Sequence, residues 1–147
     1  MADDEDVATL LARIREEQQR LRALLAGKDE AFLAQRPPTG KWSVRENVRH
    51  LLFAEHAHLG RVTSGRVRFD TPNLPPQDVK EVRRQRMVGT ETTSLAELLA
   101  AWATLHERAS ALAGDDTAPA RRALFVNLRH LRAHLAVIER LLRAHPR

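Results

Sequence analysis

Apolar residues recur every three or four positions along four segments of the chain, which is the spacing of residues on one face of an α-helix. The pattern predicts helices over about 6–26, 44–63, 95–112 and 120–145. No segment shows a convincing alternation of apolar and polar residues, so strands are not expected. The chain is therefore predicted to be all-α.

The second and third of these helices begin with the same capping sequence. Ser43 is followed three residues later by Glu46, and Ser94 is followed in the same way by Glu97. In each pair the two side chains can bond the backbone N–H groups that the first helical turn leaves without partners. Between the two helices, the prolines of 70–77 exclude a regular helix.

Four long amphipathic helices in a chain of 147 residues pack most simply as one four-helix bundle. We expect a single domain over 1–147, with its core over about 6–144. The long connection between the second and third helices permits a short helix over 78–87. A connection of this length also permits a crossover, so the topology need not be simple up-and-down.

The amino-acid composition limits the kinds of metal ligand and the location that the chain can have. The chain has no cysteine, which excludes disulfides and leaves imidazole and carboxylate as the side-chain ligands for a transition metal. No uninterrupted apolar run approaches the ~20 residues that a membrane-spanning helix needs, and the acidic start MADDEDVA differs from a secretion signal. We expect a cytoplasmic protein that does not span a membrane.

The formal net charge is +5 and the isoelectric point is near 10.8, which raises the question of an anionic partner. The arginines are scattered over all the helical segments, and aromatic residues make up only 4% of the chain. Nucleic-acid binding favours a continuous basic stripe with aromatic recognition elements. We therefore expect arginine-rich solvated faces rather than a nucleic-acid partner.

Two of the seven histidines, His130 and His134, lie four residues apart beside the apolar stripe of the last helix. Residues at this spacing are neighbours on one helical face, and two imidazoles so placed can bind one metal ion. A typical site needs a third ligand from another helix. His50 is the best placed of the remaining histidines, because it lies on the corresponding shoulder of the second helix.

Glu55 falls within the apolar face of the second helix. A carboxylate there must be paired, protonated or exposed to a cavity, because an isolated buried charge costs several kcal/mol. One interpretation is an interhelical salt bridge with an arginine. The other is a general base, or a partner that orients a metal-binding imidazole.

Together these residues resemble the DinB/YfiT-like superfamily. The resemblance rests on Trp42-Ser43 at the start of a helix, on His50 seven residues after the serine, and on H-x-x-x-H in the last helix, here His130 and His134. It implies a four-helix bundle, often homodimeric, with zinc or nickel bound by these three histidines. One departure is Val137, which stands where many members have glutamine in H-x-x-Q-I.

The resemblance also implies candidate activities. Members of the superfamily include transferases and isomerases that depend on low-molecular-weight thiols, and a metal-bound water can also serve hydrolysis. One hypothesis is therefore a metal-dependent S-transferase or hydrolase. The alternative is a non-catalytic, stress-related homodimeric bundle with a structural or vestigial metal; DNA binding ranks third, and the substrate stays open.

Overall fold

The computed structural model describes residues 5–62, 94–112 and 115–144. This part of the chain is helical and contains no strand. Its elements are α1 (Val7–Leu25), α2 (Glu30–Leu33), α3 (Val44–Val62), α5 (Leu95–Leu112) and α6 (Ala118–Ala144). The bounds of the four long helices agree with the predicted ones to within two residues.

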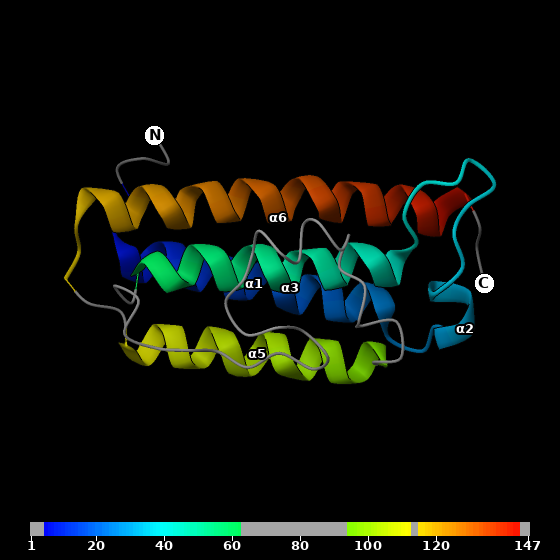
Figure 1. The fold of residues 1–147 in the computed structure, drawn as a ribbon, viewed down its shortest axis with the longest axis horizontal. Helices are drawn as coiled ribbons and strands as arrows, with labels where there is room; N and C mark the ends of the chain where they lie inside the picture. Colours follow the sequence, from blue (N-terminus) through cyan, green and yellow to red (C-terminus); the bar gives the residue numbers. More distant parts are fainter. Residues whose placement is uncertain (1–4, 63–93, 113–114, 145–147) are drawn as a thin grey trace.

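The four long helices lie side by side, and α2 lies at one end of them (Figure 1). α6 packs against both α1 and α3, and α3 also packs against α5. α1 and α6 run in one direction, whereas α3 and α5 run in the other (Figure 1). The topology is therefore not simple up-and-down. The sequence had left this possibility open, because a long connection permits a crossover. The predicted connection and its short helix over 78–87 lie outside the described residues.

Both predicted capping boxes are present. The Ser43 hydroxyl accepts a hydrogen bond from the Glu46 backbone N–H at 3.1 Å, and the Ser43 N–H donates to the Glu46 carboxylate at 3.1 Å. Ser94 and Glu97 repeat the arrangement at 3.1 and 3.3 Å. These contacts satisfy backbone donors that would otherwise lack partners, and so define where α3 and α5 begin.

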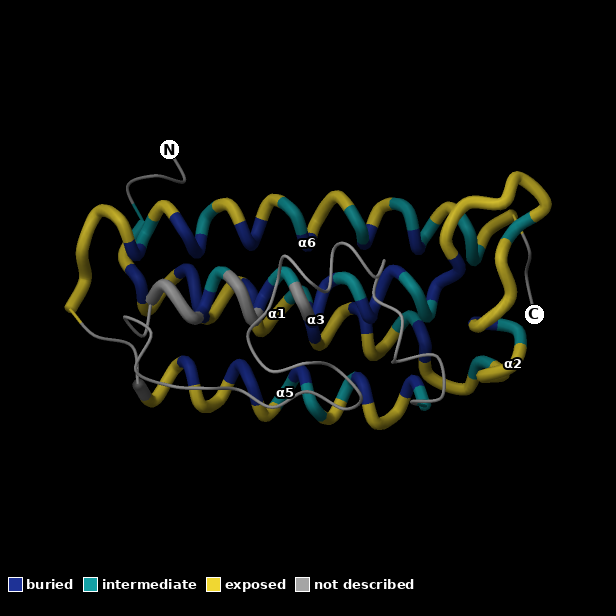
Figure 2. The backbone as a smooth tube through the Cα atoms, viewed as in Figure 1, coloured by how far each residue is buried: buried dark blue, intermediate teal, exposed yellow. Residues whose placement is uncertain are grey.

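The interior consists mainly of leucine, and the buried positions of each helix turn toward its neighbours (Figure 2). Burying a leucine side chain stabilises the fold by roughly 1.5–3 kcal/mol relative to leaving it in water. The largest fully buried side chains are Leu10, Ile14, Leu21, Leu33, Leu52, Leu59, Leu98, Leu124, Leu128, Leu131 and Leu135. The apolar stripes of the sequence thus form one shared core.

α2 was not expected from the sequence. It has only four residues, which is too short for a helical period to be recognised. Its Leu33 is fully buried in the core, and its Glu30 carboxylate accepts a hydrogen bond of 2.5 Å from the backbone N–H of Leu95. The short helix therefore closes one end of the core and binds the first turn of α5.

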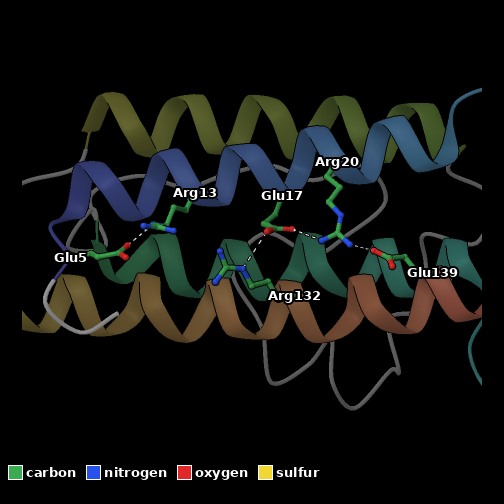
Figure 3. A network of polar contacts seen from close by, with 6 residues as sticks. All are labelled: Glu5, Arg13, Glu17, Arg20, Arg132 and Glu139. Carbon is green, nitrogen blue, oxygen red and sulfur yellow. Dashed lines mark hydrogen bonds and ion pairs between the residues drawn. The ribbon is translucent and has the colours of Figure 1, made fainter. Parts of the chain in front are cut away.

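On the opposite side from the core, charged residues link α1 to α6 (Figure 3). Arg132 lies 3.2 Å from Glu17, and Glu17 also pairs with Arg20, which reaches Glu139. The arginines are about half exposed, so each pair contributes at most about 1 kcal/mol. Some of the surface arginines are therefore paired with carboxylates of the protein itself.

None of the helices in the described part of the chain combines the length and the hydropathy required to span a membrane.

Candidate metal centre

The structure brings the three candidate histidines together. His50 comes from α3, and His130 and His134 come from α6. One ring nitrogen from each histidine lies within 4.8 Å of the others, and the ring centroids are 4.5–4.9 Å apart. Among the described residues this is the one group of three or more histidine or acidic side chains with spacing suited to a metal ion.

The positions of these histidines follow from the helices that carry them. His130 and His134 are one turn apart on α6, and α3 runs antiparallel beside it, so that His50 faces the pair. All three residues are half-buried, next to the fully buried Leu131 and Leu135. The shoulder position expected from the helical projection is therefore confirmed. It lets the rings converge without displacing the leucine core.

The ring nitrogens are compatible with a shared metal ion. His50 Nε2 and His130 Nε2 are 3.0 Å apart. Two imidazole nitrogens bound tetrahedrally to one Zn²⁺ lie about 3.4 Å apart, given bond lengths near 2.0–2.1 Å. Three neutral imidazoles are a common donor set for zinc, nickel, copper and iron. The donor set and its spacing therefore fit a divalent transition metal.

His134 is suited to remain neutral. Burial of the ring, together with the smaller effect of the neighbouring His130, lowers the pKa of His134 from 6.5 to about 4. Burial acts in this way because it disfavours the charged imidazolium. A metal-binding imidazole must be unprotonated, so at neutral pH His134 needs to release no proton before binding an ion.

Asn47 is a polar neighbour of the centre that the sequence analysis did not single out. It is buried, one turn before His50 on α3. Its Oδ1 lies 2.8 Å from Nδ1 of His134, and its Nδ2 donates to the backbone carbonyl of Ser43 at 2.8 Å. A single asparagine on a helix carries no sequence signal for such a role; only its spacing of three residues from His50 hints at a shared face.

Trp42 lies against two of the three histidines. Its ring centroid is 5.0 Å from that of His50 with the planes tilted, and 6.5 Å from that of His134 with the planes nearly parallel. The side chain is also 38% exposed, which is unusual for a large apolar residue here. Trp42 thus packs against His50 and His134 while part of its own surface stays in contact with solvent.

Glu55 lies in the interior, away from the arginines expected as one alternative. It is 1% exposed, and its carboxylate accepts hydrogen bonds from Gln18 Nε2 at 2.8 Å and from Asn127 Nδ2 at 3.1 Å. His106 Nδ1 lies 3.7 Å away. The salt bridge with an arginine is therefore wrong: the side chains that meet this carboxylate from α1, α5 and α6 are two amides and an imidazole.

Three other histidines and Val137 are not among the three residues of the cluster. His106 is buried beside the Glu55 carboxylate. The side chain of His56 and the whole of His145 lie outside what the structure describes. Val137 is half-buried and lies three residues after His134, at the position where many members of the family have glutamine. Its side chain has no polar atom to take the place of that glutamine.

Comparison with known proteins assigns the chain to a family. Comparison with curated proteins and with solved structures gave no match. A model of the DinB superfamily, however, matches residues 13–138, which covers all four long helices in part or whole and all three histidines of the cluster. The match spans most of the chain, and we conclude that this protein belongs to the DinB superfamily.

Proposed function

We propose that this protein is a metal-dependent enzyme whose divalent ion is bound by His50, His130 and His134. The observation that carries the proposal is the convergence of three ring nitrogens from two helices within 4.8 Å. Zinc and nickel are the expected metals, because both accept imidazole ligands and the chain has no thiolate to offer. Three protein ligands would leave positions open for water or substrate.

The open positions suggest the type of reaction. A bound divalent ion makes coordinated water or a coordinated thiol more acidic, and so supplies a nucleophile near neutral pH. We assign the protein to thiol-dependent S-transfer or to hydrolysis, with a low-molecular-weight thiol as the co-substrate in the first case. In this chain the three histidines would hold the ion, and Trp42 packs against His50 and His134 beside it.

We assign Glu55 to the fold rather than to catalysis. Its carboxylate is 1% exposed and already accepts two amide hydrogen bonds. A general base needs access to the proton that it removes, directly or through one water. Sequestration in the core supports a structural role.

The wider architecture is part of the same proposal. The mutual packing of α1, α3, α5 and α6 supports one four-helix bundle domain with a long connection between α3 and α5. The homodimer and the cytoplasmic location rest on the family resemblance and on the cysteine-free composition.

The test is metal binding followed by activity. The purified protein is reconstituted with Zn²⁺ and Ni²⁺, dialysed, and analysed for metal beside the double variant His50→Ala, His130→Ala. His58→Ala is the matched control, because this histidine lies on α3 and outside the cluster. We expect stoichiometric metal in the wild type and the control, and loss of metal in the double variant. Equal metal contents in all three proteins would contradict the site.

Activity separates the enzyme from a structural metal protein. The metal-loaded chain is assayed for transfer of a small thiol to an electrophilic acceptor and for ester hydrolysis. In the transfer reaction the thiol loses its proton, sulfur bonds to the acceptor carbon, and the acceptor's leaving group departs. Metal binding without either activity across a broad panel would favour the non-catalytic alternative.

A further inference from the structure

We propose that Asn47 is a positioning residue of the histidine cluster: it holds His134 in the tautomer with hydrogen on Nδ1, and so leaves Nε2 as the metal-binding atom. This inference rests on the proposed metal-binding function, and it specifies which atom of His134 that function uses.

The carbonyl oxygen of Ser43 can only accept hydrogen bonds. It lies 2.8 Å from one end of the Asn47 side-chain amide, so that end must be the Nδ2 donor. The same oxygen also accepts the first backbone bond of α3, from the Asn47 N–H at 3.0 Å. The carbonyl oxygen thus accepts two hydrogen bonds, one for each lone pair. Because it cannot donate, the end of the Asn47 amide that faces it is the NH₂ group, and the orientation of the amide is fixed.

The opposite end of the amide is then Oδ1, which also can only accept. It lies 2.8 Å from Nδ1 of His134, so Nδ1 must carry the hydrogen. A neutral imidazole has one N–H, which leaves the lone pair of this ring on Nε2. Metal-binding histidines usually donate their other ring N–H to an oxygen in this way, which fixes both the tautomer and the ring orientation.

Ser43, whose carbonyl binds the Asn47 amide, is itself held in place by hydrogen bonds. Ser43 is 1% exposed and forms the capping box with Glu46. Arg36 binds the Glu46 carboxylate through two nitrogens, at 2.9 and 2.8 Å, and so restrains the cap from the loop side. Hydrogen bonds therefore run without a break from Arg36 to His134. The first turn of α3 and the ring orientation of a metal-binding residue are parts of one network.

The test removes the amide and reads both the tautomer and the affinity. Asn47→Leu has similar size and no polar atom, whereas Asn47→Asp keeps an acceptor for His134. Asn127→Leu is the matched control, since Asn127 is a buried asparagine that bonds Glu55 rather than the cluster. The tautomer is read from the ¹⁵N shifts of His134 in metal-free protein near neutral pH, and the Zn²⁺ dissociation constant by chelator competition.

We expect an Nδ1–H tautomer in the wild type, in Asn47→Asp and in Asn127→Leu. Asn47→Leu should shift His134 toward Nε2–H or a mixture, and should weaken Zn²⁺ binding about 10- to 100-fold. Asn127→Leu should leave the affinity within about twofold, because it shares no partner with the cluster. If circular dichroism shows that Asn47→Leu does not fold, the tautomers of His134 in the wild type and in Asn47→Asp still test the proposal.

The two proposals fail in different ways. An Nε2–H tautomer of His134 in the wild type would overturn the role of Asn47, whether or not zinc binds. Wild-type affinity in a folded Asn47→Leu protein would overturn it as well. An Nδ1–H tautomer in a wild-type chain that binds no Zn²⁺ would instead overturn the proposed metal function, while supporting the hydrogen-bond assignment.

Discussion

Glu55 of α3 accepts a hydrogen bond from Gln18 of α1 at 2.8 Å, between two residues that are both almost completely buried. Asn127 of α6 donates to the other carboxylate oxygen at 3.1 Å, and His106 of α5 lies 3.7 Å away. Each long helix thus contributes one polar side chain to a single place in the leucine core. The carboxylate is therefore a buried polar link among the four long helices, in addition to the apolar contacts of the core.

Removing this carboxylate should destabilise the fold strongly. Glu55→Ala leaves two buried amide donors without an acceptor, at about 1–3 kcal/mol each, and adds a cavity. We expect a loss of about 3–5 kcal/mol in the free energy of unfolding, measured by urea denaturation. Glu55→Gln keeps one acceptor and should lose about 1–2 kcal/mol. Glu107→Gln, at an exposed position on α5, is the control, and equal stabilities of Glu55→Ala and this control would refute the linking role.

The low pKa of His134 makes stability depend on pH. Its pKa is 6.5 in the unfolded chain and about 4 in the folded one. Between these values the unfolded chain binds a proton that the folded chain does not, so stability falls as the pH is lowered from about 6.5 to about 4. Because the ring is half-buried and partly screened by solvent, we expect a total of about 1–2 kcal/mol rather than the full effect of the shift.

The measurement is urea unfolding of metal-free protein across this pH range, beside His134→Gln. The variant should lose much of the pH dependence, because it lacks the titrating ring. An unchanged slope in the variant would show that other groups cause it. Zn²⁺ binding should weaken over the same range, since protons compete for the same nitrogens.

The cap of α3 should contribute to stability without setting the tautomer of His134. Ser43→Ala removes the hydroxyl that accepts from the Glu46 N–H and should cost about 1 kcal/mol. It keeps the backbone carbonyl that orients Asn47, so Zn²⁺ affinity should stay close to that of the wild type. Ser94→Ala removes the equivalent cap of α5 and is the matched control. A large loss of zinc affinity in Ser43→Ala alone would mean that the hydroxyl also holds the site.

Trp42 should report on metal binding by fluorescence. Its ring lies 5.0 Å from that of His50, and Trp102→Phe leaves it as the sole tryptophan of the chain. Ni²⁺ has partly filled d orbitals that accept excitation energy at short range, whereas Zn²⁺ has a filled d shell. We expect Ni²⁺ to quench the emission and Zn²⁺ to leave most of it. Quenching that persists in the His50→Ala, His130→Ala background would place the ion elsewhere.

Much of this architecture could be predicted from the sequence, because helical periodicity and capping boxes are local signals. They located the four long helices, and the spacing of His130 and His134 placed two rings on one face. Projection of a single helix shows which way a residue faces but not what it meets. For that reason Gln18 and Asn127, rather than an arginine, were found around Glu55 only in the structure.

The residues that orient the site were harder to find for a related reason. Asn47 bonds His134 across 87 residues of sequence, and no local pattern encodes a contact between two helices. The single turn of α2 was missed because four residues cannot display a period. Both are features of tertiary packing that local propensity does not report.

The first turn of α5 is held by its own capping residues and by a residue of α2. Ser94 and Glu97 cap it, and Glu30 of α2 binds its first N–H from a part of the chain 65 residues away. The start of α5 is therefore held both by its own cap and by a contact from α2, which lies on the other side of the long connection in the sequence.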